Sequence, residues 1–114
     1  MSTASTAPVS AHFSQSYKEA RDKFLHAAES AGLHATEHAH PMLGRDGEAL
    51  AMDVVRHGAP DAPALLIISS ACHGVEGFCG SGVQVALLRD AAGAGAGAGA
   101  VGGGGGGGDR KSVV

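Results

Sequence analysis

The chain has 114 residues, a formal net charge of −3 and an aromatic content of 4%, values typical of one small domain without surfaces for base stacking. It contains no basic or acidic tract and no tryptophan, so we expect no nucleic-acid partner. The most compact apolar run, residues 64–68, is far too short to span a bilayer, and residues 1–13 lack the basic and apolar regions of a signal peptide. We therefore expect a cytoplasmic protein without a membrane partner, whose two cysteines stay reduced. No pattern predicts an oligomeric state.

The first predicted element is a helix over residues 16–31, preceded by a small, polar segment, residues 1–13, that we expect to be disordered. Ser16 and Glu19 have the spacing of a capping box, in which side chains satisfy the free amide groups at a helix start. Apolar residues then recur at helical spacing, and Gly32 stands where a left-handed C-cap belongs.

Two strands joined by a tight turn are predicted next. A short strand begins near His34 and is expected to break near Pro41, since proline cannot donate to a ladder. Asp46-Gly47 marks the turn, and residues 49–58 form the second strand of a hairpin. Leu50, Met52 and Val54 share one face of this strand, and Ala51, Asp53 and Val55 share the other. The sequence does not decide whether Asp53 faces solvent or braces a neighbouring loop.

The continuous apolar run ALLIISS, residues 64–70, predicts a strand that is buried on both faces inside a sheet covered by helices. A second helix follows over residues 80–90, with Val83, Ala86 and Leu87 on its apolar face. This order of elements indicates an α/β protein with a mixed, mostly parallel sheet. The interior strand lacks enough neighbours, so the chain is expected to be the opening, truncated part of a larger domain.

The loop after the buried strand, residues 72–81, carries the residues with the clearest chemistry. Ligands bind beyond the carboxyl ends of strands in open α/β sheets. The loop lacks the lysine of a P-loop, the third glycine of a dinucleotide fingerprint and the flanking glycines of a nucleophile elbow. His73 and Glu76 can instead converge on one ion, because Gly74 lets the backbone turn sharply and zinc accepts both imidazole nitrogen and carboxylate oxygen.

The segments SYKEARDKFLHAAESAGL and HPMLGRDGEALAMDVVRHGAPDAPALLIISSACHGVEGFCGSG resemble the N-terminal part of the bacterial DUF2817 family. That family is similar to the zinc carboxypeptidases of the M14 type and to succinylglutamate desuccinylase and aspartoacylase. The resemblance covers roughly residues 13–90, and the HGVEGF segment is its most specific part. It implies that His73 and Glu76 are the first two zinc ligands. It also implies a carboxypeptidase-like sheet between helices and hydrolysis of an amide bond in a peptide or small-molecule substrate.

The chain departs from such enzymes downstream of the motif. In those enzymes a third ligand, a histidine, comes later in the chain, together with a catalytic glutamate and substrate-binding arginines. Here no histidine follows His73, no glutamate follows Glu76, and the only later arginines are Arg89 and Arg110. We therefore expect residues 14–90 to be an N-terminal fragment of a zinc-dependent amide hydrolase, inactive and weakly zinc-binding by itself.

Residues 91–114, AAGAGAGAGAVGGGGGGGDRKSVV, form a Gly/Ala low-complexity tail that cannot add to a core, since Gly and Ala bury little surface. DRKSVV matches one reading frame of a common sequencing adapter, and a guanine-rich run would encode the polyglycine. We interpret the tail as an artefact of a reading frame that ran off a genomic fragment, rather than as a natural linker.

Other interpretations of the sequence remain open. The chain could be a non-enzymatic α/β fragment, or a small binding module in which the H-x-x-E pattern is incidental. Cys72 and Cys79 could join His73 and Glu76 in a structural zinc site, but buried free cysteine is the ordinary case. His38 and His40 could hold a transition metal, but an exposed polar edge strand explains them more simply.

Overall fold

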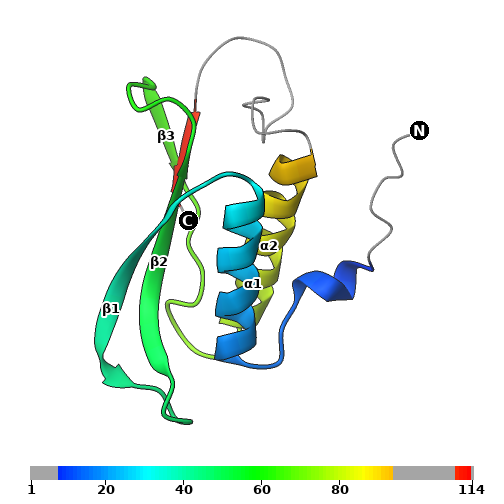
Figure 1. Ribbon diagram of the computed structural model, residues 1–114, viewed down its shortest axis with the longest axis vertical. Coiled ribbons are helices and arrows are strands. Elements are labelled where there is room, and N and C mark those ends of the chain that lie inside the picture. The colour runs from blue at the N-terminus through cyan, green and yellow to red at the C-terminus, as the bar shows by residue number, and fades with distance from the viewer. Residues whose placement is uncertain (1–7, 94–109, 114) are drawn as a thin grey trace.

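A computed structural model of the chain describes residues 8–93 and 110–113, and it places two helices side by side on one face of a β-sheet (Figure 1). The predicted mixed α/β class is therefore confirmed. Neither helix is long and apolar enough to cross a membrane in this described part of the chain. The elements in chain order are the 3₁₀ helix η1 (Val9–His12), α1 (Tyr17–Ser30), β1 (Ala35–Leu43), β2 (Ala49–His57), β3 (Ala64–Ile67), α2 (Gly77–Gly93) and β4 (Arg110–Val113).

The two ends of α1 are capped as the sequence predicts. Ser16 Oγ accepts the Glu19 amide at 3.2 Å, while the Glu19 carboxylate accepts the amide of Gln15 at 3.1 Å, a contact that lowers the pKa of Glu19. At the other end Gly32 has a φ of 72°, and the amide of Leu33 donates to the carbonyl of Ala28 at 2.9 Å. This is a Schellman motif, so Gly32 is the predicted left-handed cap.

The predicted hairpin joins β1 and β2, which pair antiparallel. Gly47 adopts a φ of 78° in the turn, a backbone conformation that favours glycine. Pro41 does not end the strand as expected. The regular register instead runs to Ala39 and resumes at Leu43, with an irregularity around the proline, which β1 accommodates because it is an edge strand.

The sheet is mixed, and its order is β1-β2-β4-β3. β2 pairs with both β1 and β4 in antiparallel fashion, and β3 pairs with β4 in parallel. A mostly parallel sheet is therefore not confirmed.

The predicted low-complexity tail contributes to two elements: its first residues, Ala91–Gly93, are the last residues of α2, and Arg110–Val113 form β4. Residues 94–109 and 114 of this tail lie outside the described residues, as do residues 1–7 of the segment predicted to be disordered. Within that segment, Val9–His12 form η1.

The core lies between the two helices and the inner face of β2. It consists of Phe24, Ala27 and Ala28 from α1, Val55 from β2, and Val85 and Leu88 from α2. On the opposite face of β2, Met52 is 64% exposed, so the predicted alternation of the two faces is confirmed. Small alanines let the two helices approach each other closely, and the core that results is compact but small.

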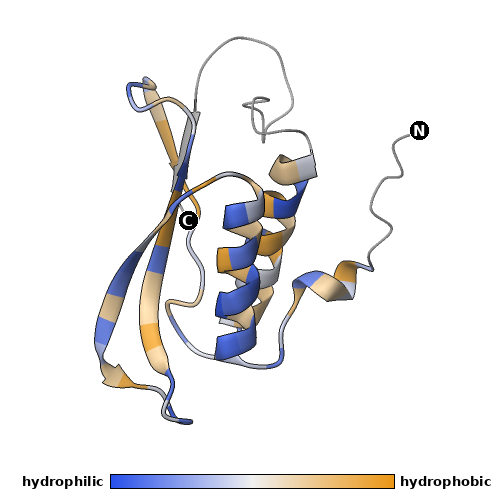
Figure 2. Ribbon diagram, viewed as in Figure 1, coloured by the Kyte–Doolittle hydropathy of each residue, from blue (hydrophilic) through white to orange (hydrophobic). Residues whose placement is uncertain are grey.

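β3 was predicted to be buried on both faces, and this prediction is wrong for the described residues. Leu65, Leu66 and Ile67 are each more than half exposed. The run is apolar enough for an interior strand, as its colour in Figure 2 shows, but the two helices lie over β2 and leave β3 uncovered. Sequence hydrophobicity reports what a strand can bury, whereas burial depends on which elements lie against it.

The apolar face predicted for α2 is also wrong. Val83 is 49% exposed, whereas Gln84, Val85 and Leu88 are buried. The helix has apolar residues around its whole circumference, so its periodicity does not select a face. The buried face of α2 is instead determined by its contacts. The ring of Phe13 occupies the space where a side chain at position 82 would lie, so Gly82 faces inward.

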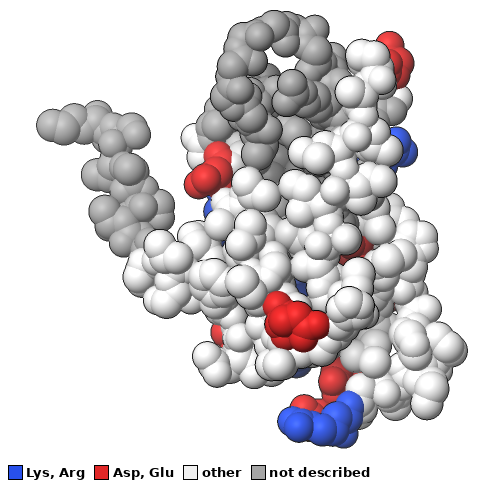
Figure 3. Space-filling view, turned by 180° about the vertical axis from the view of Figure 1, so that it is seen from behind, with Lys and Arg blue, Asp and Glu red and all other residues white. Residues whose placement is uncertain are grey.

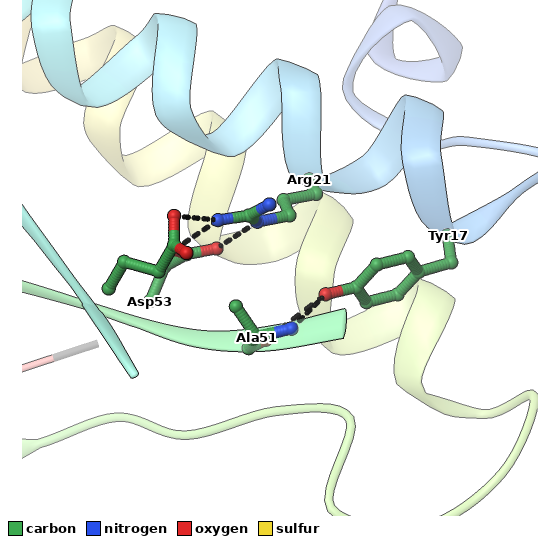
Figure 4. A network of polar contacts seen from close by, with 5 residues as sticks. Tyr17, Arg21, Ala51 and Asp53 are labelled. Atoms are coloured by element: carbon green, nitrogen blue, oxygen red, sulfur yellow. Dashed lines mark hydrogen bonds and ion pairs between the residues drawn. The ribbon is translucent and has the colours of Figure 1, made fainter. Parts of the chain in front are cut away.

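A polar network fixes α1 to β2 (Figure 4). Arg21 Nε donates to Asp53 Oδ2 at 2.8 Å and Arg21 Nη2 to Asp53 Oδ1 at 3.0 Å, and the same Nη2 donates to Glu37 on β1 at 2.7 Å. The Asp53 side chain is only 7% exposed, so its charge is almost removed from water. The hydrogen bonds that Arg21 donates to Asp53 raise the pKa of the Arg21 guanidinium. Asp53 thus braces a helix, which resolves the question that its sequence position left open.

Tyr17 makes a second contact between the same two elements. Its hydroxyl accepts the amide of Ala51 at 2.8 Å and donates to the Ala51 carbonyl at 3.1 Å (Figure 4). One side chain of α1 therefore satisfies both backbone groups of a residue in β2.

We expect Asp53→Ala to lower the free energy of unfolding by about 3 kcal/mol, because it leaves the Arg21 charge without its buried partner. Glu37→Ala is the matched control. Glu37 is 58% exposed, and its loss should cost less than about 1 kcal/mol. Urea denaturation followed by circular dichroism measures both values. Equal losses in the two variants would show that the buried pair does not hold α1 on the sheet.

Candidate functional site

A pocket of about 250 Å³ lies where the chain leaves β3 and enters α2. The two residues predicted to bind metal, His73 and Glu76, are both on its wall. The position is the carboxyl end of a strand, where ligands bind in open α/β sheets. The lining residues are Ser69, Ser70, Ala71, Cys72, His73, Glu76, Gly77 and Gly80.

One residue with an unusual backbone conformation bends the chain at this pocket, and two glycines allow the backbone segments to approach closely. Ala71 has a φ of 60°, in the left-handed region that costs a non-glycine residue roughly 1–2 kcal/mol. A Cβ added to Gly77 would lie 2.7 Å from the Cα of Ala71, and one added to Gly80 would lie 2.6 Å from the Cβ of Ser70. Only glycine therefore allows α2 to begin so close to the end of β3.

His73 and Glu76 are brought together by the turn between these elements. His73 Nδ1 lies 3.5 Å from Glu76 Oε1, and the same oxygen accepts the amide of Gly74 at 3.2 Å. The two side chains are 85% and 64% exposed, so a solute can reach both. Two ligands of one tetrahedral zinc ion, each about 2.1 Å from the metal, stand about 3.4 Å apart. The observed separation therefore fits two neighbouring positions of such a site.

A third ligand does not join this pair among residues 8–93. No group of three or more His, Cys, Asp or Glu side chains is close enough to hold a metal ion in that range. The donor set thus has the chemistry that zinc prefers and supplies two of the three protein ligands that a catalytic zinc site needs.

Gln84 is a site residue that the sequence analysis missed. It is 6% exposed, its Oε1 accepts the hydroxyl of Ser70 at 2.9 Å, and its Nε2 donates to the carbonyl of Ile68 at 3.2 Å. A glutamine inside the apolar helical run VQVALL is the signal that could have identified it, because a buried amide needs hydrogen-bond partners.

No other metal-ligating candidate forms a group with His73 and Glu76 in the described part of the chain, although Cys72 lines the same pocket. Cys72 and Cys79 are free and exposed, so the expectation of buried cysteines is wrong. Cys72 lies in the exposed turn before α2, and Cys79 occupies an exposed position in the first turn of α2 itself. His38 and His40 are exposed on the edge strand β1, as expected, and His40 Nδ1 accepts the amide of Met42 at 3.0 Å.

Fold and pocket together define a small α/β protein with a histidine–glutamate pair at a strand end. The chain belongs to the DUF2817 family, described as a protein of unknown function, whose sequence profile matches residues 13–101. The match spans both His73 and Glu76 and confirms the predicted membership of the DUF2817 family. Searches of curated proteins and of solved structures each found no match.

We expect Gly77→Ala to destabilise the protein by about 1–3 kcal/mol, because the added methyl group would collide with the backbone of Ala71. Gly93→Ala is the matched control in the same helix. Nothing lies within 4 Å of the methyl group it adds, and alanine favours a helix, so its effect should be neutral or slightly stabilising. Thermal unfolding of the two variants measures the difference. A Gly77→Ala protein as stable as the wild type would contradict the close approach of α2 to Ala71.

Proposed function

We propose that the protein is part of a zinc-dependent amide hydrolase of the carboxypeptidase-like class, in which His73 and Glu76 hold the metal. The observation that carries this proposal is the 3.5 Å separation of Nδ1 and Oε1 inside a pocket at a strand end. The similarity of the DUF2817 family, whose pattern includes the HGVEGF segment, to M14-type zinc carboxypeptidases supports it. A bound zinc ion would polarise a substrate carbonyl and lower the pKa of a metal-bound water.

The described residues have clear parts in this proposal. His73 would bind through Nδ1 in its neutral form, so protons would compete with the metal for that nitrogen. Glu76 would bind through a carboxylate oxygen, and the amide of Gly74, which already donates to that oxygen, would keep it oriented. The substrate would be a peptide or an acylated amino acid, whose amide carbonyl enters the pocket from the open side.

The proposal extends to the sheet. In a carboxypeptidase-like fold β3 would be an interior strand with further parallel neighbours and helices on both faces. The exposed side chains of Leu65, Leu66 and Ile67 support this arrangement, since apolar strands of this kind are stable when covered.

A second candidate is a non-catalytic α/β unit in which His73 and Glu76 form only a polar contact. The observation that favours it is the missing third ligand among residues 8–93. The two candidates differ in what they predict for a metal titration.

Zinc added to the whole chain should bind at one site that contains His73. Nuclear magnetic resonance of the imidazole groups resolves each histidine, so the response of His73 can be separated from that of the others. We expect His73→Ala and Glu76→Gln each to weaken binding by more than about tenfold, since each removes a ligand. His38→Ala is the matched control, because His38 is exposed on β1, and it should leave the titration unchanged.

Unchanged zinc binding in His73→Ala would remove the metal proposal and leave the non-catalytic candidate. The hydrolase part is tested in a DUF2817 member that carries a later histidine and glutamate. There the substitutions equivalent to His73→Ala and Glu76→Gln should abolish zinc-dependent hydrolysis of acylated amino acids and peptides.

A further inference from the structure

We propose that Gln84, acting through Ser70, is a positioning residue that sets the distance between His73 and Glu76. This inference rests on the proposed function, since it concerns how the same pair would receive a cation. The starting observation is that Gln84 is a polar residue that is only 6% exposed. Burial of an amide is costly unless both its donor and its acceptor are used, and both are used here on the segment that leads to His73.

The two hydrogen bonds of Gln84 hold the chain on both sides of Ser69. The amide nitrogen donates to the carbonyl of Ile68, and the amide oxygen accepts the hydroxyl of Ser70. The next residue, Ala71, makes the left-handed turn that sends the chain toward His73. Gln84 therefore fixes the backbone immediately before the bend, and the direction of the bend determines where the imidazole lies.

The same side chain belongs to the helix that follows Glu76. α2 begins at Gly77, directly after Glu76, and Gln84 lies two turns further along it. The contact thus joins the segment that carries one proposed ligand to the helix that follows the other. Gly80, which touches Ser70, lets the two approach closely enough for this contact to form. A ligand pair needs its geometry held to within about half an ångström, so loosening the contact should weaken cation binding.

A purely structural role for Gln84 makes a different prediction. Loss of the buried amide would then lower the stability of the fold, while the folded molecules would keep their affinity for a cation. A positioning role requires that the affinity of the folded protein itself falls. Zinc affinity measured on fully folded protein therefore separates the two roles.

The experiment titrates zinc into the whole chain and follows the ring nitrogens of His73 by nuclear magnetic resonance. Ser70→Ala removes one hydroxyl, and Gln84→Met removes both hydrogen bonds while keeping most of the side-chain volume. Ser81→Ala is the matched control, because Ser81 lies on α2 outside the pocket lining and its side chain makes no hydrogen bond within the described residues. Amide signals recorded before zinc is added establish that each variant is folded.

We expect Ser70→Ala and Gln84→Met to raise the dissociation constant for zinc about tenfold, the lower end of what the loss of an outer partner costs. The dissociation constant of Ser81→Ala should stay within about twofold of the wild-type value. In the wild type the ¹⁵N shifts of His73 should show zinc on Nδ1, and in the two variants this preference for Nδ1 over Nε2 should weaken.

Wild-type affinity and Nδ1 binding in a folded Ser70→Ala protein would overturn the positioning role and leave the metal proposal intact. The same result in Gln84→Met would overturn it independently, and if Gln84→Met does not fold, Ser70→Ala alone decides. No response of His73 in the wild type would overturn the metal proposal and this inference with it.

Discussion

The contact between the start of α2 and the residues that follow β3 determines the geometry of the pocket. Gly77 and Gly80 let the helix backbone lie against Ala71 and Ser70, where any side chain would collide. Because the helix begins so close to the strand end, the residues from His73 to Glu76 must form a tight turn that faces both side chains toward one another. The pair is therefore a product of backbone packing, and its exposure to solvent is compatible with a defined separation.

The core and one ion pair position the two helices on the sheet. The core residues around Val55, Val85 and Phe24 press α1 and α2 against a single strand, β2, and the Arg21–Asp53 ion pair fixes the orientation of α1. Around this core, charged side chains on the face turned away from the view of Figure 1 are few and scattered (Figure 3). The small core and the uncovered residues of β3 mean that most of the packing energy is concentrated on one side of the sheet.

The features that the sequence predicted correctly depend on neighbours in the chain. The Ser16 cap, the Gly32 terminus and the Gly47 turn each need only a few adjacent residues, and the proximity of His73 and Glu76 needs one glycine-containing turn. Burial of β3, the inward face of α2 and the partner of Asp53 depend on segments far away in the chain. Hydrophobic periodicity carries no information about those segments, and an all-round apolar helix such as α2 gives no preferred face. For the same reason the sequence does not reveal the hydrogen bonds of Gln84, whose partners Ile68 and Ser70 lie on the far side of the turn.

The Tyr17 contact has a consequence for how the sheet can extend. A strand that lay alongside β2 at Ala51 would need the amide and carbonyl groups that the phenol already occupies. Strand pairing on that side of β2 is thus blocked at Ala51. It occurs instead at the C-terminal end of β2, where Arg56 and His57 pair with β4. A single tyrosine hydroxyl on a neighbouring helix thus prevents another strand from pairing with this part of β2. It thereby protects an exposed sheet edge against edge-to-edge aggregation.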